Sequence, residues 1–268
     1  MGRIAALFER KNRNILNVYC TAGYPKLDST IAVMQALQNN GADIIELGMP
    51  YSDPLADGPV IQASGSKAIE NGMTIDTLFA QLENMRKPVA VGENNSQGGG
   101  IDIPVVLMGY MNPVLQYGFE RFCAAAARVG IDGLILPDLP MFEFDTEYGT
   151  IIKKYQLDFI FLVTPETSEE RIQLLDQRSS GFLYAVSSSS TTGTDKNFAS
   201  LENYFEKLEK LSLKNPVLVG FGIKDKTSFS EACKYANGAI IGSAYIKALE
   251  HVTDVNAATK DFLAAVLD

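Results

Sequence analysis

Basic residues, cysteine, histidine and long apolar stretches are all scarce in this chain of 268 residues. Lys and Arg number 23 against 32 Asp and Glu, which gives a net charge of −9 at pH 7. So acidic a protein lacks the positive surface that nucleic acid and anionic membranes attract, because both must have their phosphates neutralised. We therefore expect neither kind of partner.

The few cysteines and the single histidine argue against a metal site. Cys20, Cys123 and Cys233 are odd in number, lie far apart and stand among apolar residues, so they form neither a disulfide framework nor a zinc motif. We expect reduced thiols in the core. His251 lies in a polar stretch, which indicates a solvated side chain rather than a metal ligand or part of a catalytic triad.

Targeting and membrane segments are also missing from the pattern. The first 16 residues, MGRIAALFERKNRNIL, have no long apolar core with a cleavage site, and no later stretch is apolar enough to cross a bilayer. Gly2 is followed by no Ser or Thr at the position that myristoylation requires. The sequence predicts a cytoplasmic protein.

What the chain does have is a series of eight short apolar runs, each with Gly, Pro, Ser or Thr at or near its end. This is typical of buried parallel strands that run into loops. With helical segments between them, they predict a single-domain (β/α)₈ TIM barrel over residues 1–268, with an extra N-terminal helix. An open doubly wound sheet is the alternative, but the count of eight favours closure, and no G-x-G-x-x-G follows the first run. The runs are 17–23, 44–50, 104–110, 133–139, 159–165, 182–188, 216–222 and 238–244.

The segments between the runs have helical patterns. Residues 28–40 place apolar side chains on one helical face, with Asp28 as the expected N-cap and Gly41 as the C-terminal cap. Two helices, at about 60–70 and 75–86, are expected before the polar tract 92–100. That tract forms an extended loop before the third strand, on the face opposite the expected active site, so a linker is favoured over a lid.

Glu46 is an acidic residue in the middle of an otherwise apolar strand, IIELG. Burial of an ionised carboxylate costs several kcal/mol of hydration unless another group compensates for it. Two interpretations follow: a structural pair with a buried Lys or Arg, or a general acid/base whose pKa is raised toward neutrality. Its position near the carboxyl end of a barrel strand favours the second.

The loop after this strand contains Asp53 and Asp57 among prolines and a glycine. Pro54, Gly58 and Pro59 restrict the backbone to a defined turn. Because Asp is a favoured turn residue, the residues alone favour turn capping over catalysis at both positions.

Two glycine-bearing turns follow the last two strands, GFGIK at 220–224 and IGSA at 241–244. This is the recurrent phosphate site of the fold, where main-chain amides hold the anion without basic side chains. Tight turns without a ligand are the alternative. The serine-rich loop 187–195 after the sixth strand is compatible with either a lid or a solvated connection.

These features together resemble the tryptophan synthase alpha family. The similar motifs extend over nearly the whole chain, and the most specific is GADIIELGMPYSDPLADGPVIQ at 41–62. The others are LFER near the start, TAGYP at 21–25, YMNPV at 110–114, GLILPDLP at 133–140, TTGT at 191–194, GFGI at 220–223 and IGSA at 241–244.

The resemblance implies retro-aldol cleavage of indole-3-glycerol phosphate to indole and glyceraldehyde 3-phosphate. It implies that Glu46 is the acid/base catalyst and that Asp57 accepts the indole N–H and stabilises the cation formed when indole C3 is protonated. No cofactor is expected on this chain; pyridoxal phosphate is expected only in a beta partner. The partner implied is the tryptophan synthase beta subunit in an α₂β₂ complex.

Binding residues are implied in the same way. Asp53 and Pro54 occupy the loop that faces the beta subunit in the family, and the serine-rich stretch occupies the place of its closing lid. The implied indole pocket consists of Tyr19, Met108, Tyr110, Leu136 and Tyr184, and the implied phosphate site of Thr192, Gly193, Phe221, Gly222, Gly242 and Ser243. The chain departs from the family pattern in Tyr19, where many relatives have phenylalanine, in the long tract 92–100 and in the serine-rich lead into the TTGT motif.

Two other functions remain open at this point. One is a subunit that activates a beta partner and has little activity of its own, against which the retention of Glu46 and Asp57 argues. The other is a stand-alone lyase that releases free indole, or another barrel enzyme that acts on a sugar phosphate. The Asp53–Pro54 loop favours the partnered form.

Overall fold

The computed structural model describes residues 1–87, 100–186, 202–220 and 222–268. Within them one parallel sheet has the strand order β5-β4-β3-β2-β1-β9-β8-β7-β6. The serine-rich loop 187–195 and the tract 92–100, apart from Gly100, lie outside the described residues.

The sheet closes on itself through one divided strand. β5 (Asp158–Phe159) pairs with β4, whereas β6 (Leu162–Val163) pairs with β7. The two residues between them continue the pairing on opposite sides, because the amide of Ile160 donates to Leu134 and the carbonyl of Phe161 accepts from Tyr184, both at 3.0 Å. β5 and β6 are therefore two halves of the fifth strand of an eight-stranded barrel, and the predicted fold is confirmed.

Each of the other strands overlaps a predicted apolar run and starts or ends within a few residues of it. Almost every strand residue is buried, as expected for strands covered by helices outside and filled by side chains inside. The bounds are β1 Ile15–Thr21, β2 Ile44–Gly48, β3 Val105–Met108, β4 Gly133–Ile135, β7 Leu183–Val186, β8 Val217–Gly220 and β9 Gly238–Ile241.

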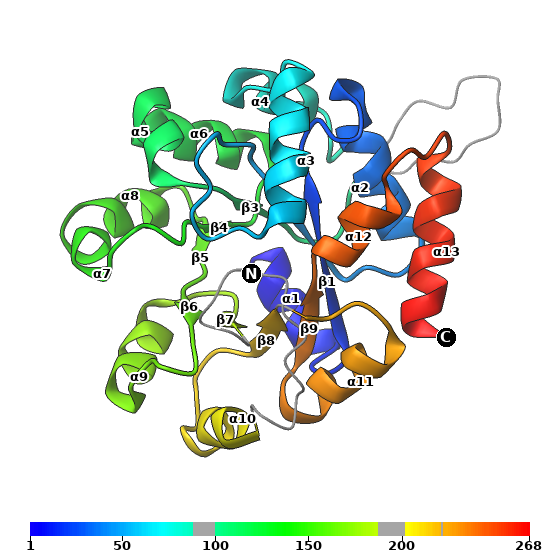
Figure 1. Cartoon of the computed structure of the whole chain (residues 1–268). Helices are drawn as coiled ribbons and strands as arrows, with labels where there is room; N and C mark the ends of the chain where they lie inside the picture. The colour runs from blue at the N-terminus through cyan, green and yellow to red at the C-terminus, as the bar shows by residue number, and fades with distance from the viewer. Residues whose placement is uncertain (88–99, 187–201, 221) are drawn as a thin grey trace.

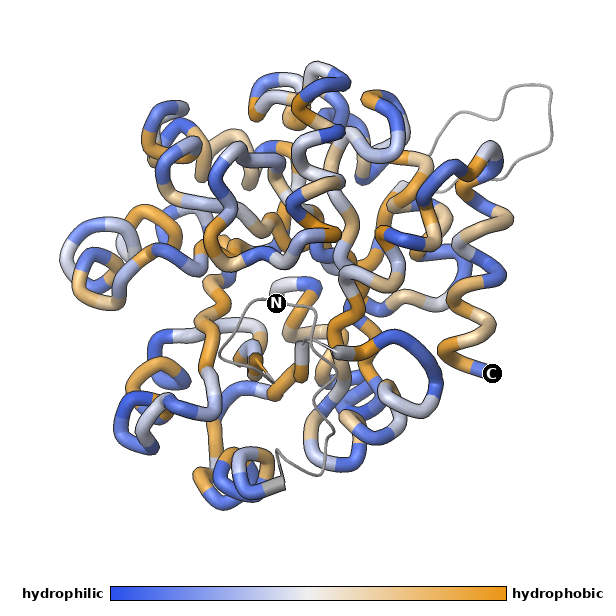
Figure 2. The backbone as a smooth tube through the Cα atoms, in the orientation of Figure 1, coloured by the Kyte–Doolittle hydropathy of each residue, from blue (hydrophilic) through white to orange (hydrophobic). Residues whose placement is uncertain are grey.

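The helices surround the barrel (Figure 1), and the hydrophobic parts of the chain gather toward the strands while the outer helical turns are hydrophilic (Figure 2). The two helices predicted between the second and third strands are confirmed as α3 and α4. The helix bounds are α2 Thr30–Asn39, α3 Pro59–Glu70, α4 Ile75–Leu82, α5 Met111–Tyr117, α6 Phe119–Val129, α7 Met141–Glu143, α8 Gly149–Lys154, α9 Glu169–Arg178, α10 Glu202–Lys210, α11 Lys226–Tyr235, α12 Ser243–Ala248 and α13 Val255–Leu267. Short helical segments also occur at Leu27–Ser29 (η1) and Phe144–Tyr148 (η2).

The predicted N-cap at Asp28 is wrong. Asp28 lies inside η1, and Ser29 stands at the N-cap of α2 without a side-chain capping bond. The physical reason is that a 3₁₀ turn, in which the Ser29 amide donates to the carbonyl of Lys26 at 3.0 Å, includes Asp28 and moves the start of α2 to Thr30. Gly41 follows α2 with φ +104°, a conformation that favours glycine, as expected of a C-terminal cap.

The extra N-terminal helix α1 (Arg3–Arg10) closes the amino end of the barrel. Ile4 and Leu7 are buried, and Ile4 packs beside Gly181, two residues before β7. Arg3 pairs with Asp132, which immediately precedes β4. These contacts lie where strands begin, so α1 leaves the carboxyl end of the barrel free.

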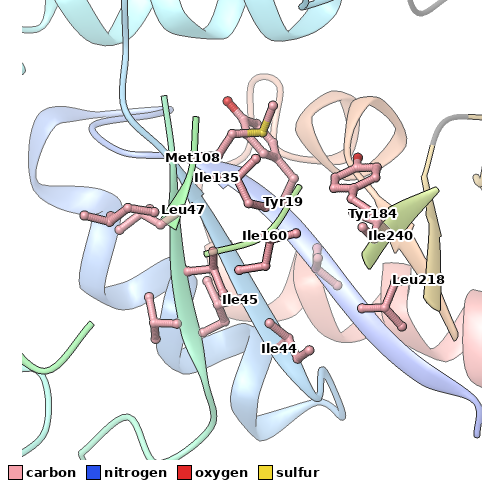
Figure 3. Close-up of a cluster of buried hydrophobic side chains, with 14 of the residues drawn as sticks. Tyr19, Ile44, Ile45, Leu47, Met108, Ile135, Ile160, Tyr184, Leu218 and Ile240 are labelled. Carbon is pink, nitrogen blue, oxygen red and sulfur yellow. The ribbon is translucent and has the colours of Figure 1, made fainter. Parts of the chain in front are cut away.

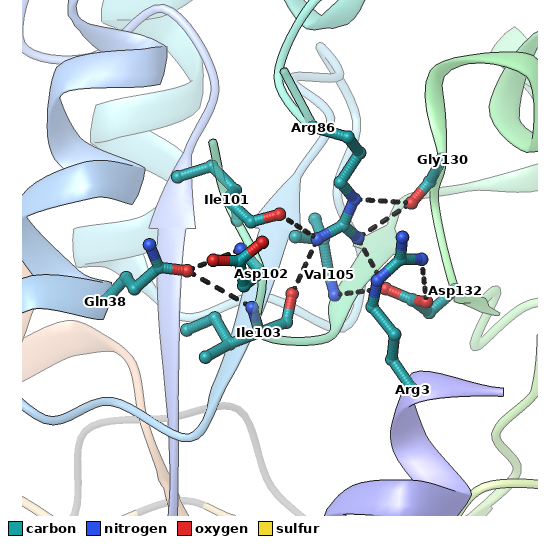
Figure 4. Close-up of polar contacts among 9 residues, drawn as sticks. All are labelled: Arg3, Gln38, Arg86, Ile101, Asp102, Ile103, Val105, Gly130 and Asp132. Carbon is teal, nitrogen blue, oxygen red and sulfur yellow. Dashed lines mark hydrogen bonds and ion pairs between the residues drawn. The ribbon is translucent and has the colours of Figure 1, made fainter. Parts of the chain in front are cut away.

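Arg86, whose side chain is 15% exposed, ties the segments before β3 and β4 together at this same end (Figure 4). The Arg86 guanidinium donates to the carbonyls of Ile101 and Ile103 at 2.7 Å each, and to the carbonyl of Gly130 at 3.0 and 2.7 Å. It also lies 2.6 Å from the Asp132 carboxylate, whose side chain is only 6% exposed. The guanidinium thus makes five hydrogen bonds to three carbonyls and one carboxylate. These bonds replace the hydration that the acceptors lose on burial.

Replacement of Arg86 by Met should therefore lower the free energy of unfolding by about 3 kcal/mol, because Asp132 and three carbonyls would lose their shared donor. Urea denaturation monitored by circular dichroism measures this loss. Arg128→Met is the matched control: its 3.3 Å pair with Glu83 is exposed, so the loss should be below about 1 kcal/mol. Equal losses in the two variants would contradict the structural role of Arg86.

Candidate active site

The inner face of the barrel is defined by the strand register. Tyr19 pairs with Glu46, and Glu46 with Val106, while Asn17 pairs with Ile240 and Tyr184 with Leu218. Residues in register point to the same face, and alternate residues of a strand share it. Several apolar side chains of this inner face, among them Ile44, Leu218 and Ile240, belong to the buried cluster of Figure 3. Asn17 and Glu46 lie on the same face and are also buried.

Glu46 is 1% exposed and receives a hydrogen bond from the Asn17 amide, with Nδ2 3.1 Å from Oε2. Burial raises the pKa of Glu46 to about 8, because the carboxylate loses its hydration. The Asn17 bond opposes this rise and the nearby Asp57 charge adds to it. The interactions of Glu46 among the described residues include no Lys or Arg, so the structural ion pair considered for it is not what the structure records.

Asp57 lies in the loop after β2, which Tyr110, just after β3, holds in place. The hydroxyl of Tyr110 accepts a hydrogen bond from the amide of Ala56 at 3.1 Å and interacts with the Asp57 side chain. Burial raises the pKa of Asp57 to about 6, while the Tyr110 bond lowers it. Asp57 also closes a local turn through its own amide, which donates to Pro54. The turn bond is made by the main chain alone, whereas the interaction of the Asp57 side chain is with Tyr110.

Tyr19 and Tyr184 both lie near this acidic pair. Both are nearly buried, and burial raises the pKa of both hydroxyls well above its usual value, with the charges of Glu46 and Asp57 acting in the same direction. Figure 3 shows their rings together with Met108 at one end of the core cluster, and Ile44 toward the other end. A Cβ atom at Gly48 would overlap the Tyr19 hydroxyl, and one at Gly220 would overlap the Tyr184 ring. These two glycines provide the space for the tyrosines.

The other predicted indole-pocket residues fit the same region. Met108 ends β3, Tyr110 follows two residues later, and Leu136 follows β4, so all three lie at the carboxyl ends of neighbouring strands. Each is at least 92% buried. The combination of apolar walls and a few polar groups is the usual character of a small-molecule site.

The predicted phosphate residues are only partly described. Thr192, Gly193 and Phe221 lie outside the described residues. Gly222 adopts φ +78°, which favours glycine. Gly242 follows β9 at the N-cap of α12, with Ser243 as the first helical residue. A Cβ at Gly242 would lie 3.6 Å from that of Tyr19, so this turn adjoins the predicted indole pocket.

Asp53 and Pro54 lie apart from the pocket on the outer part of the loop. Asp53 is exposed and accepts a hydrogen bond from Ser52 at 2.7 Å, Pro54 is partly exposed, and Leu55 is 87% exposed. The same loop thus carries Asp57 on its inner side and an apolar residue on its outer side.

Sequence reasoning missed two polar residues near the site. Asn17 carries a signal, because it alternates with Tyr19 along a buried strand and so shares its inner face. Asp138, after β4, accepts the amide of Met111 with both carboxylate oxygens at 3.0 Å and fixes the start of α5 beside Tyr110. No local pattern predicts that contact, since the two residues are 27 positions apart.

A barrel with two carboxyl groups of raised pKa at the carboxyl ends of its strands, beside an apolar pocket, defines an acid/base enzyme of the (β/α)₈ class. The family model for the tryptophan synthase alpha chain matches residues 5–266. The chain belongs to the tryptophan synthase alpha chain family. The predicted family, fold and enzyme class, an indole-3-glycerol-phosphate lyase, are thereby confirmed.

Curated relatives and solved structures are similar to this chain over most of its length. The chain is 51% identical over 250 residues to the tryptophan synthase alpha chain of Flavobacterium johnsoniae, covering 93% of this chain and 94% of that one. It is 46% identical over 251 residues to that of Parabacteroides distasonis, covering 93% of each. The tryptophan synthase subunit alpha of Legionella pneumophila superposes with a TM-score of 0.85 at 33% identity, covering 99% of this chain and 97% of that one.

Other expectations concern the rest of the molecule. The three cysteines are free and buried, as predicted, and His251 is exposed. In the part of the chain that the structure describes, no helix is both long and apolar enough to pass through a bilayer.

Replacement of Gly220 by Ala should force Tyr184 out of place. We expect a loss of about 2 kcal/mol in the free energy of unfolding, typical of an overpacked core, and a fall in kcat/KM. Gly65→Ala in α3 is the control: its new Cβ would meet nothing within 4 Å, and Ala suits a helix better than Gly, so stability should be kept or raised. Wild-type stability and turnover in Gly220→Ala would show that the Tyr184 ring is not held as described.

Proposed function

We propose that this chain cleaves indole-3-glycerol phosphate to indole and glyceraldehyde 3-phosphate in tryptophan biosynthesis, with Glu46 and Asp57 as its catalytic groups. The observation that carries this assignment is the buried Glu46 carboxyl group, which lies close enough to Asp57 for the two charges to interact and has a pKa of about 8, against about 6 for Asp57. Two carboxyl groups with separated pKa values take different roles at the same pH.

At pH 7 Glu46, with a pKa of about 8, is mostly protonated, and Asp57, with a pKa of about 6, is mostly ionised. Glu46 gives its proton to indole C3 and becomes a carboxylate. That carboxylate then takes the proton of the glycerol hydroxyl attached to the breaking bond, the hydroxyl carbon becomes the aldehyde, and the bonding electrons return to the indole ring. Glu46 ends protonated, so the cycle needs no outside acid or base.

Asp57 stabilises the charge that appears between these two proton transfers. Protonation at C3 leaves a cationic ring, and the Asp57 carboxylate accepts the indole N–H. Because the ring is neutral in the substrate and cationic afterwards, this interaction is stronger in the transition state than in the ground state. Tyr110 supports the role, since its contacts with Ala56 and Asp57 hold the loop over the pocket.

Two groups of residues would bind the substrate. Tyr19, Met108, Tyr110, Leu136 and Tyr184 would enclose the indole ring. Thr192, Gly193, Phe221, Gly222, Gly242 and Ser243 would surround the phosphate, which main-chain amides can hold in an acidic protein. The reaction needs no cofactor on this chain.

A partner follows from family membership, which implies a tryptophan synthase beta subunit. We assign the contact to Asp53 and Pro54, with the exposed Leu55 beside them, and place the chain in a cytoplasmic α₂β₂ complex. Pyridoxal phosphate would belong to the beta subunit.

An assay for indole release from indole-3-glycerol phosphate, with and without a beta subunit, tests this function. Activity in neither condition would refute the lyase, full activity alone would favour a stand-alone enzyme, and activity only with the partner would favour the complex.

Glu46→Gln should abolish turnover, with circular dichroism unchanged, because an amide cannot exchange the proton. Glu70→Gln, on the exposed face of α3, is the control and should keep wild-type turnover; wild-type turnover in Glu46→Gln would refute the assignment.

Asp57→Asn should lower kcat about 10²- to 10³-fold, the usual effect of removing one group that stabilises developing charge. Affinity for glycerol phosphate, measured by calorimetry, should fall much less, because Asp57 faces the indole end of the substrate. A parallel collapse of rate and glycerol phosphate affinity would instead assign Asp57 to ground-state binding.

A further inference from the structure

Asn17 is a polar residue in a part of the barrel that is otherwise apolar. It lies in β1, is fully buried, and stands in register with Ile44 of β2 and Ile240 of β9. A hydrocarbon side chain would fill this position at lower cost, because an amide loses its hydration on burial. The interactions of the side chain therefore need an explanation.

Among the described residues, the Asn17 amide makes one hydrogen bond, from Nδ2 to Glu46 Oε2 at 3.1 Å. Its Oδ1 atom is buried and has no hydrogen-bond partner in the same part of the chain. An amide used for packing or strand pairing would be expected to satisfy both ends. Here Oδ1 is left unsatisfied while Nδ2 donates to the Glu46 carboxyl group. The position of the Asn17 side chain therefore serves Glu46.

The other groups near Glu46 show why the Asn17 bond matters for its protonation. They are Tyr19 and Cys20 on β1, Asp57 in the loop after β2, and Tyr184 on β7. Burial raises the pKa of both tyrosines and of the thiol, so these groups stay neutral, and Asp57 has the same sign of charge as ionised Glu46. The Asn17 bond is the interaction recorded as favouring the carboxylate form of Glu46.

We propose that Asn17 is a positioning residue for catalysis: its amide holds the Glu46 carboxyl group in the orientation from which it transfers protons, and stabilises the carboxylate that forms in mid-reaction. The proposal rests on the proposed function, since it acts through Glu46. In this proposal Asn17 acts through Glu46 and not on the substrate.

The proposal predicts the direction in which the pH dependence of the reaction should shift. Because the Nδ2–H bond stabilises the charged form, its loss should raise the pKa of Glu46 above about 8. The alkaline limb of kcat/KM, on which protonated Glu46 is lost, should then move up by about one to two pH units. At the same time kcat should fall roughly tenfold or more, because a weaker and less firmly held acid transfers its proton more slowly.

The test compares Asn17→Val with the wild-type chain; the branched side chain of Val suits a strand. Both are assayed in the condition, with or without a beta subunit, in which the wild type releases indole. Asn17→Ala is the second variant, in case Val does not fit. Profiles of kcat and kcat/KM against pH are measured, and the Glu46 carboxyl group is titrated by carbon-13 NMR, its resonance identified by its absence in Glu46→Gln. Urea denaturation confirms that each variant is folded.

Asn215→Ala is the matched control. Asn215 is another buried asparagine that donates to a buried carboxylate, with Nδ2 2.9 Å from Asp176 Oδ1, far along the chain from the site. Its replacement should lower stability and leave the pH at the midpoint of the alkaline limb unchanged.

A raised Glu46 titration together with the shifted limb and lowered kcat supports the proposal. An unshifted Glu46 titration, an unchanged kcat, or a loss of rate that is the same at every pH would overturn it and leave Asn17 a structural residue. Absence of indole release from the wild type would overturn the proposed function and this proposal together, whereas a normal wild type with unaltered Asn17 variants overturns this proposal alone.

Discussion

The exclusion of water from Glu46 is the constraint on which the rest of the site depends. The carboxyl group lies among apolar side chains inside a closed barrel, and burial is the largest cause of its raised pKa. Barrel closure is therefore part of the chemistry, because an open sheet would leave the same residue hydrated and ionised at neutral pH. Closure in turn depends on the divided fifth strand, which pairs with β4 through one half and with β7 through the other.

The same exclusion of water separates the two acids. Glu46 belongs to a strand and cannot approach solvent without a change in the barrel, whereas Asp57 belongs to a loop and is only partly buried. Tyr110 also offers Asp57 a hydrogen bond that favours its ionised form. Position in the fold, strand against loop, thus sets which acid holds its proton at pH 7 and which does not.

Much of the barrel could be predicted from local pattern, because a strand buried on both faces needs a continuous apolar run and a boundary residue, and both are visible in sequence. The division of the fifth strand at Ile160 and Phe161 could not, since it reflects how two partners share one strand. Glu46 was visible as an acid in an apolar run. The place of Asp57 was not, because it depends on Tyr110, which binds Ala56 across 54 positions of the chain; only the family resemblance supplied it. The role of Asn17 could not be predicted for a different reason: an amide in a strand indicates no function by itself, and only its bond to Glu46 does.

The two ends of the barrel divide stability from chemistry. At the amino end, Arg86 and Arg3 neutralise Asp132, and α1 covers the strands. At the carboxyl end, the described surroundings of Glu46 hold a like charge, two neutral tyrosines and one amide. A cation placed there would stabilise the Glu46 carboxylate and so remove the proton that the proposed reaction needs at pH 7. The ion pairs of Asp132 lie at the opposite end, where they connect α1 and the segments before β3 and β4 without altering the acid. A single amide can orient Glu46 while leaving its proton in place.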